Sequence, residues 1–275
     1  MNTTVTRSIS GIVFLAVMIG CLLEVRYLFP FLFLFIQAQM LREFYQITLG
    51  DRHKAVQKAA ILLAMTAFGL VWLYLGPKPL PLKYFSILLP LLVCLLIWMV
   101  VDHKDFKEYA YVLAGLLYIG LPVALAPFVV SGANGYSGLL MLAFFIIIWS
   151  SDVGAYCFGM VFGQKIWPAK MCPEISPKKS WAGFFGGWLT VLVAAYILIR
   201  TGMIDFPVVH VLVMASLMHV TGVFGDLFES LWKRQFGVKD SGNIMPGHGG
   251  LLDRFDSALF AIPMAYVYLV LFELV

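Results

Sequence analysis

The chain consists of long apolar runs separated by short polar stretches, and this alternation constrains the fold more than any other feature. A helix needs about 20 apolar residues to cross the hydrocarbon core of a membrane. Charged residues make up only 12% of the 275 residues, whereas a soluble domain carries roughly 25%. The sequence therefore predicts an all-α polytopic integral membrane protein. The nine expected helices cover residues 8–25, 26–42, 56–75, 82–101, 109–130, 138–162, 181–200, 208–228 and 256–274.

The N-terminal sequence MNTTVTRS has no small-residue cleavage site before a second apolar run, so we expect the first run to be retained and not removed as a signal peptide. The first two expected helices are short, which leaves open a hairpin that does not fully cross the membrane. We interpret residues 1–275 as a single integral-membrane domain. Residues 1–140 would supply scaffold helices, and residues 141–275 would supply catalytic helices and cytoplasmic loops.

Positive charge is distributed unevenly when the expected helices alternate across the membrane. One side keeps only Arg26, Lys78, Lys83 and Arg200 of the 19 Lys and Arg residues. Because positive charge stays cytoplasmic, we expect the N-terminus inside, the C-terminus outside and a polar cavity on the cytoplasmic side. The net charge of +4 is modest, and we expect no nucleic-acid partner.

The four cysteines show no spacing typical of a metal site or a disulfide framework. Most of them fall within apolar runs. We therefore interpret them as small buried hydrophobic residues. They are Cys21, Cys94, Cys157 and Cys172.

The stretch GDLFESLWKRQFGVKDSGNIMPGHGGLLDRFDS at Gly225–Ser257 concentrates charge between two apolar runs. Asp226 ends one expected helix, and Asp253 and Asp256 begin the next with a spacing that puts both on one helical face. Three carboxylates from two helix ends suit Mg²⁺, which takes oxygen ligands and shares itself with substrate phosphates. The alternative is that these are helix-end charges at the lipid headgroups.

Cations and glycines follow these acids. Lys233, Arg234 and Lys239 alternate with the carboxylates, which suits a site for Mg²⁺ and several phosphates, although a positive cytoplasmic loop has the same appearance. Glycines in PGHGG at 246–250 let main-chain N–H groups approach an anion. This pattern is neither a P-loop nor a GxGxxG fingerprint. We expect His248 in this loop to contact substrate.

Two further features precede this stretch. Asp152 follows an apolar run in SSDVGAYCFG, and a carboxylate at membrane depth is usually functional. It could instead be a structural residue hydrogen-bonded to a neighbouring hydroxyl. In SPKKS, Lys178 and Lys179 could hold phosphates, and Ser180 could cap the helix before Trp181.

The residues of the 225–257 stretch closely resemble the signature of the phosphatidate cytidylyltransferases, also called CDP-diacylglycerol synthases. The segments SDVGAY and PEISPKKSWAG are also similar to this family, so the resemblance covers about 145–257. The matching positions are Ser230, Lys233-Arg234, Lys239-Asp240, His248-Gly249-Gly250 and Asp253-Arg254-Phe255-Asp256.

The resemblance implies transfer of the cytidylyl group of CTP to phosphatidic acid, with release of pyrophosphate. It implies Mg²⁺ as the cofactor, with Mn²⁺ and a second cation left open, and a homodimer in the bacterial inner (cytoplasmic) membrane. Asp226, Asp253 and Asp256 would be metal ligands, and Lys233 would join them as a catalytic residue. Substrate contacts would come from Asp152, Lys178, Lys179, Ser180, Arg234, Lys239, His248, Gly249 and Arg254.

Two other functions stay open on the residues alone. A CTP-dependent lipid kinase would transfer the γ-phosphoryl group to an alcohol. An ion transporter could use Asp152 as its coupling carboxylate, although the charge gathers at one face and not at the bilayer midplane.

Overall fold

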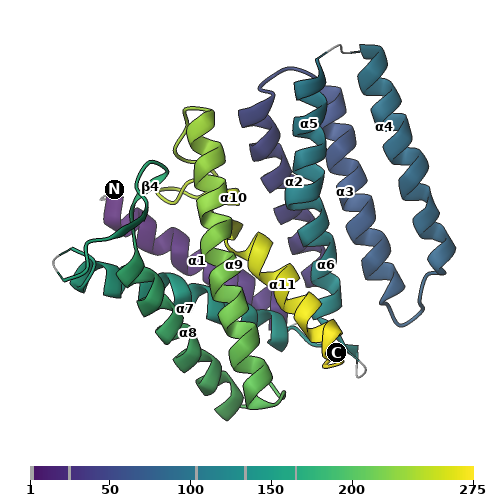
Figure 1. Ribbon diagram of the computed structural model, residues 1–275. Coiled ribbons are helices and arrows are strands. Elements are labelled where there is room, and N and C mark those ends of the chain that lie inside the picture. Colours follow the sequence, from purple (N-terminus) through teal and green to yellow (C-terminus); the bar gives the residue numbers. More distant parts are fainter. Residues whose placement is uncertain (1–2, 24–25, 103–104, 133–134, 165) are drawn as a thin grey trace. The chain divides into compact units, whose positions relative to one another are not determined.

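Helices make up most of the computed structural model, which describes residues 3–23, 26–102, 105–132, 135–164 and 166–275 (Figure 1). The join of the first two expected helices, at residues 24 and 25, lies outside the described residues. The chain divides into two compact units. The N-terminal unit comprises Met1–Ser137 and Asp240–Arg254, and the C-terminal unit comprises Gly138–Lys239 and Phe255–Val275.

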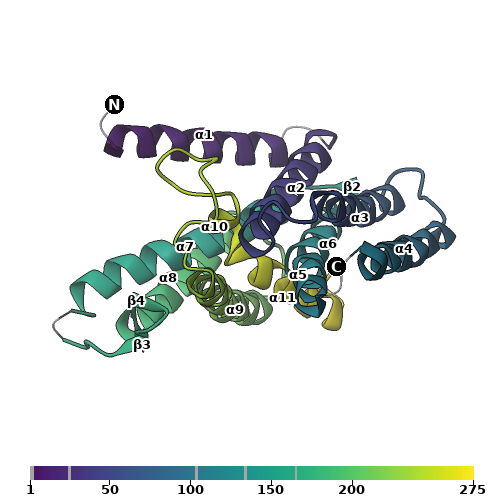
Figure 2. The same ribbon diagram turned by 90° about the horizontal axis from the view of Figure 1, so that it is seen from above.

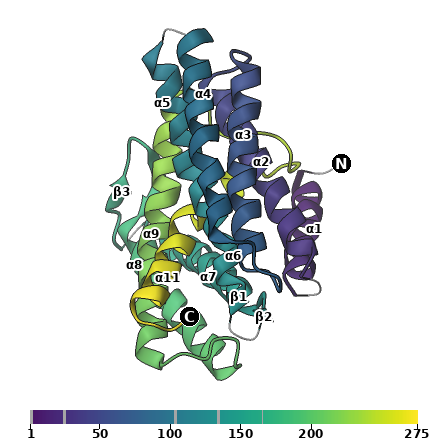
Figure 3. The same ribbon diagram turned by 90° about the vertical axis from the view of Figure 1, so that its right-hand side faces the viewer.

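The N-terminal unit is a group of helices in which α2, α3 and α6 pack together and α4 lies beside α3 (Figure 3). Helix α2 turns away from the end of α1 (Figure 2). Two short antiparallel strands of two residues each, β1 and β2, pair Ser131 with Tyr136. The elements are α1 (Thr3–Leu23), α2 (Leu28–Thr48), α3 (Lys54–Tyr74), η1 (Leu82–Ile87), α4 (Leu88–Asp102), α5 (Phe106–Gly115), η2 (Leu116–Gly120), α6 (Leu121–Val129), β1 (Ser131–Gly132) and β2 (Gly135–Tyr136).

Close contact between α2 and the α5–η2 segment fixes the position of α2 in this unit. The buried Tyr45 hydroxyl donates a hydrogen bond to the Val112 carbonyl oxygen at 2.9 Å. A Cβ atom at Gly115 would lie 2.6 Å from the Tyr45 ring, so only glycine allows this approach. Further along, the buried Gln37 amide donates to the Gly120 carbonyl oxygen at 3.0 Å.

Among the described residues, eight helical segments are long and apolar enough to cross a membrane, which confirms the all-α polytopic class. The expected count of nine is not confirmed. Helix α2 is continuous and as long as its neighbours, but it is not one of the eight. Its second half carries Gln37, Arg42 and Glu43, which lower its mean hydropathy.

The C-terminal unit consists of α7, α8, α9 and α11, with a short hairpin between α7 and α8 (Figure 1). Helix α8 packs against both α7 and α9, and α11 packs against α9. The bounds are α7 (Leu139–Val161), β3 (Lys170–Cys172), β4 (Ser176–Ser180), α8 (Trp181–Arg200), α9 (Val208–Gln235) and α11 (Ala258–Leu271). The one-turn helix α10 (Leu252–Phe255) carries the chain across the boundary of the two units.

Glycines bring α7 and α8 into close contact. A Cβ atom at Gly154 of α7 would collide with the Thr190 side chain, and one at Gly186 of α8 would collide with the Phe158 ring. The two backbones therefore approach more closely than larger residues would permit, as in other membrane helix pairs with small residues at the contact.

Two expected helix boundaries are wrong. Helix α9 continues to Gln235, so Asp226 lies inside a helix and not at its end. Asp253 lies on α10, which ends at Phe255, so Asp256 falls in a turn before α11 and the two acids do not share one continuous helix. Between α7 and α8, strands β3 and β4 pair as an antiparallel hairpin.

One of two local expectations is confirmed. The Ser180 side chain accepts a hydrogen bond from the Gly183 N–H at 3.1 Å and so caps the start of α8. The four cysteines are free, but the expectation that they are buried is wrong, because Cys94 and Cys157 are exposed and Cys21 and Cys172 are partly exposed.

Candidate functional site

A cavity of about 340 Å³ in the C-terminal unit gathers side chains from four segments of the sequence. Helix α7 contributes Asp152, strand β4 contributes Lys178 and Lys179, and α9 contributes Asp226. Acidic and basic groups thus face one space, as expected for a site that binds both cations and phosphates. The other lining residues are Ser151, Ala155, Tyr156, Met171, Ser180, Gly183, Phe184, Val223 and Ser257.

Asp226 is held by one ion pair and one hydrogen bond. The Lys179 Nζ atom lies 2.7 Å from Asp226 Oδ2 and also donates to the Val223 carbonyl oxygen at 3.2 Å. The Ser230 hydroxyl donates to Asp226 Oδ1 at 3.2 Å. About a third of the Asp226 side chain is exposed, so this carboxylate attracts a cation and remains accessible.

Below Asp226 on α9, a second ion pair is buried. Glu229 is fully buried, and its Oε2 atom lies 2.6 Å from the Nζ atom of Lys233, one turn away. Removing one partner of a buried pair leaves an uncompensated charge. Lys233 therefore serves first to neutralise Glu229.

Asp256 follows in the same unit. Its Oδ1 atom accepts a hydrogen bond from the Ser257 N–H at 2.6 Å. The negative charges that act most strongly on it are those of Asp226, Glu229 and Asp152, in that order. The charges of three other carboxylates of this unit thus act on Asp256, an arrangement that a bound cation would relieve.

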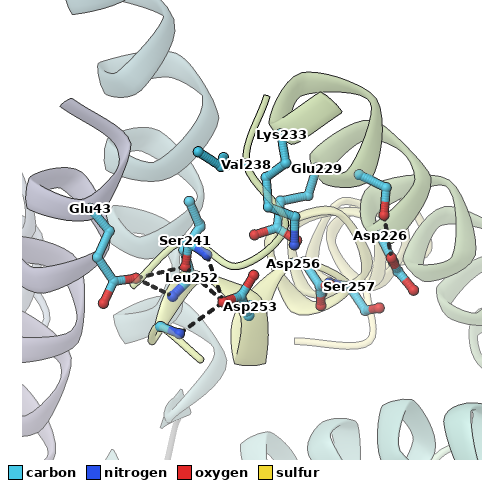
Figure 4. Close-up of polar contacts among 12 residues, drawn as sticks. Glu43, Asp226, Glu229, Lys233, Val238, Ser241, Leu252, Asp253, Asp256 and Ser257 are labelled. Carbon is cyan, nitrogen blue, oxygen red and sulfur yellow. Dashed lines mark hydrogen bonds and ion pairs between the residues drawn. The ribbon is translucent and has the colours of Figure 1, made fainter. Parts of the chain in front are cut away.

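Asp253 belongs to the N-terminal unit, where three donors hold one of its oxygens. Asp253 Oδ2 accepts hydrogen bonds from the Ser241 N–H at 2.8 Å, the Ser241 hydroxyl at 3.0 Å and the Gly250 N–H at 2.8 Å (Figure 4). Gly249 adopts a φ of +90°, and a Cβ atom there would lie 2.5 Å from the same oxygen. The glycines of PGHGG therefore fit the loop around Asp253.

His248 lies against the start of α1 in the same unit. Its Nδ1 atom is 2.8 Å from the Ser10 hydroxyl oxygen, and the Arg7 guanidinium donates to the Gly247 carbonyl oxygen at 2.8 Å. Partial burial, followed by the charges of Arg254 and Arg7, lowers the pKa of His248 below its ordinary value of 6.5. In this loop, two nearby guanidinium groups thus disfavour the positively charged form of the His248 imidazole.

The profile of the cytidylyltransferase family matches residues 5–272, which is nearly the whole chain. The chain belongs to the cytidylyltransferase family. The match places both units, and not only the signature stretch, within one family of enzymes.

Individual relatives are similar over most of their length. The phosphatidate cytidylyltransferase of Bacillus subtilis is 36% identical over 228 residues, which are 78% of this chain and 81% of the relative. The enzyme of the same name from Rickettsia bellii is 34% identical over 212 residues, which are 75% of this chain and 85% of the relative. That of Staphylococcus haemolyticus is 35% identical over 170 residues, 62% of each chain.

The structure brings together some of the residues that sequence predicted for this family. Asp152, Lys178, Lys179, Ser180 and Asp226 line one cavity. By contrast, Arg234, Lys239 and Arg254 are exposed in the structure.

The expected metal trio stays a prediction. No group of three His, Cys, Asp or Glu side chains within the described ranges could hold a metal ion as it stands. Asp226 and Asp256 lie in one unit and Asp253 in the other.

Sequence reasoning missed Glu43 of α2. This residue is 5% exposed, and its Oε2 atom accepts a hydrogen bond from the Ser241 hydroxyl at 3.0 Å. A carboxylate in an apolar helix is usually functional, and this criterion, which singled out Asp152, could also have found Glu43. The His219 Nδ1 atom lies 2.8 Å from the hydroxyl of Ser151, which lines the cavity.

Proposed function

We propose that the chain transfers the cytidylyl group of CTP to phosphatidic acid and forms CDP-diacylglycerol for phospholipid biosynthesis. The observation that carries this proposal is the cavity in which Asp152 and Asp226 face Lys178 and Lys179, in a chain of the cytidylyltransferase family. The choice of substrates comes from the relatives, which are named phosphatidate cytidylyltransferase.

The chemistry requires positioning more than proton transfer. A phosphate oxygen of the lipid forms a bond to the α-phosphorus of CTP, and the bond from that phosphorus to the bridging oxygen breaks. Pyrophosphate leaves with the electron pair. The attacking phosphate is already anionic at neutral pH because its second pKa is near 6. The protein therefore needs no strong general base, but it must bring two polyanions together.

The acidic residues are the proposed ligands of a divalent cation. Asp226 and Asp256, with Asp253, would hold Mg²⁺; Mn²⁺ and a second cation stay open. The ion pair between Lys179 and Asp226 supports this proposal, because it places a positive charge on this carboxylate inside the cavity. When bound, Mg²⁺ neutralises charge on the CTP phosphates and stabilises the leaving pyrophosphate.

The basic residues would offset the remaining phosphate charge. Lys178 and Lys179 line the cavity and are therefore the first candidates for binding the phosphates. Lys233 would reach a phosphate only by leaving Glu229. The other proposed substrate contacts are Asp152, Ser180, Arg234, Lys239, His248, Gly249 and Arg254.

Location and assembly belong to the same proposal. The uneven distribution of Lys and Arg supports an active site that faces the cytoplasm in the bacterial inner membrane. A homodimer is proposed from the resemblance, and light scattering of the detergent-purified chain measures it.

The deciding experiment measures which phosphate of CTP is transferred to lipid. The purified chain receives phosphatidic acid, Mg²⁺ and CTP labelled on either the α- or the γ-phosphate. Cytidylyl transfer puts the α-label into lipid and releases pyrophosphate. A kinase would instead put the γ-label into a lipid alcohol, which a parallel reaction supplies in place of phosphatidic acid, and ion flux in proteoliposomes without CTP would favour a transporter; either result overturns the proposal.

A further inference from the structure

Glu43 uses both of its carboxylate oxygens inside the N-terminal unit. Oε1 accepts hydrogen bonds from the Gln39 side-chain amide at 2.9 Å and the Leu251 N–H at 3.0 Å. Oε2 accepts from the Ser241 hydroxyl at 3.0 Å and the Leu252 N–H at 2.9 Å. Four donors on one buried carboxylate are typical of a group whose charge and geometry are both needed.

These hydrogen bonds connect both ends of the loop Ser241–Asp253 to α2. Ser241 lies at the start of the loop, whereas Leu251 and Leu252 lie where it enters α10. The N–H groups at the start of a helix have no partner within that helix, so an external acceptor such as Glu43 fixes the direction of the chain there. Figure 4 shows Glu43 reaching from α2 toward Ser241 and Leu252.

Ser241 links Glu43 to Asp253. Its hydroxyl oxygen lies 3.0 Å from Glu43 Oε2 and 3.0 Å from Asp253 Oδ2. A hydroxyl group carries a single proton, so it can donate fully to one of these oxygens at a time. The Ser241 and Gly250 N–H groups hold Asp253 Oδ2 in either case. The orientation of the Asp253 carboxylate thus depends on the loop that Glu43 anchors.

Glu43 also explains a glycine of the signature. A Cβ atom at Gly250 would collide with the Ser241 hydroxyl and with Glu43 Oε2. The space that a side chain would need is already filled by the anchor and its partner.

We infer that Glu43 is a positioning residue for cytidylyl transfer, which acts by holding the Ser241–Asp253 loop so that Asp253 keeps its orientation. This inference rests on the proposed function. It assigns a role in the reaction to α2, which the sequence presented only as scaffold.

The test variant is Glu43→Gln. A carboxamide keeps one acceptor oxygen and turns an NH₂ group toward a main-chain N–H donor, so the hydrogen bond from either Leu251 or Leu252 is lost. Losing a residue that orients a metal ligand typically costs about 10- to 100-fold in activity. We expect kcat to fall by about that factor, with a smaller change in the KM for CTP, and we expect faster amide exchange at Leu251 and Leu252.

Two variants serve as matched controls. Glu108→Gln changes another buried glutamate of the same unit, which pairs with Arg52 at 2.6 Å. It should lower thermal stability without slowing the reaction or exposing the Leu251 and Leu252 amides. Arg42→Gln alters the exposed neighbour of Glu43 on α2 and should change neither quantity.

Milder variants keep the test decisive if Glu43→Gln does not fold. Glu43→Asp retains the charge and should recover part of the kcat that Glu43→Gln loses, while Ser241→Ala removes only the linking hydroxyl and should lower kcat. Wild-type kcat in any folded Glu43→Gln or Ser241→Ala variant, or unchanged exchange at Leu251 and Leu252 in Glu43→Gln, would overturn the inference. If the unaltered chain makes no CDP-diacylglycerol, the proposed function fails, and the exchange measurement still decides whether Glu43 anchors the loop.

Discussion

The Lys179 ammonium lies 2.7 Å from Asp226 Oδ2 across the cavity of the C-terminal unit. Strand β4 supplies the lysine and α9 supplies the aspartate. Because Asp226 is also a proposed ligand of a divalent cation, the ammonium and that cation compete for one oxygen. Phosphates that enter the cavity would offer Lys179 a new partner.

Replacing Lys179 with Met should therefore have opposite effects on two measurements. Without the competing ammonium, Mn²⁺ should bind more tightly to the substrate-free chain, as measured by calorimetry. With CTP and lipid present, the rate should fall by about 100-fold, because a charged donor to the reacting phosphates is lost. Unchanged Mn²⁺ affinity together with an unchanged rate would show that the ion pair has only a structural role.

Asp256→Ala should abolish formation of CDP-diacylglycerol while expression and folding stay intact. A carboxylate that helps to hold the catalytic cation has no substitute within an alanine side chain. The matched control is Asp205→Ala, which removes an exposed aspartate from a loop of the same unit. If the folded Asp256→Ala variant keeps more than about a tenth of normal activity, Asp256 is not an essential ligand.

Gly249→Ala should destabilise the chain more than Gly135→Ala does. Both glycines have positive φ angles, +90° and +96°, so alanine is strained at each by about 1–2 kcal/mol. At Gly135 the added methyl group meets nothing within 4 Å, whereas at Gly249 it lies 2.5 Å from Asp253 Oδ2. Overpacking of this kind adds about 1–3 kcal/mol. Thermal unfolding of both variants measures the difference, and equal shifts in Tm would contradict it.

The loop around His248 should weaken in acid. Burial, Arg254 and Arg7 lower the pKa of His248 in the folded chain below the value of 6.5 that it has when unfolded. The unfolded state therefore binds the proton at the higher pH. The contribution to stability is present above pH 6.5 and is lost as the pH falls through the folded pKa.

Amide exchange at Met245 and His248, which both form hydrogen bonds within this loop, measures this effect. Exchange corrected for its intrinsic pH dependence should accelerate below pH 6.5. His248→Gln should remove the dependence, and the same acceleration in that variant would assign it to another group.

The sequence predicted the class of fold and singled out some of the residues that line the cavity, because both leave local signals. An apolar run marks a membrane helix wherever it packs. Asp152 and Lys179 stood out as a carboxylate in an apolar run and as a lysine before a helix, and the cavity contains both. The end of α9 was missed because charged residues such as Lys233 follow Asp226, although a buried ion pair allows the helix to continue.

The contact between Glu43 and Ser241 could not be predicted in the same way. These residues are 198 positions apart, and nothing in the pattern around either one identifies the other. The polarity that carries this contact also obscured α2 as an element, since Gln37 and Glu43 interrupt its apolar run. Buried polar groups find partners through the fold, and a local pattern cannot specify them.

The chain enters the N-terminal unit at Asp240 and leaves it after Arg254. A fragment that begins at Gly138 would thus contain every residue of the family signature and still lack the acid that secures its loop. For the same reason, a chimera that takes its first helices from a distant relative would have to import a compatible glutamate together with them. The first half of this chain is a matched part of the enzyme and not an interchangeable membrane anchor.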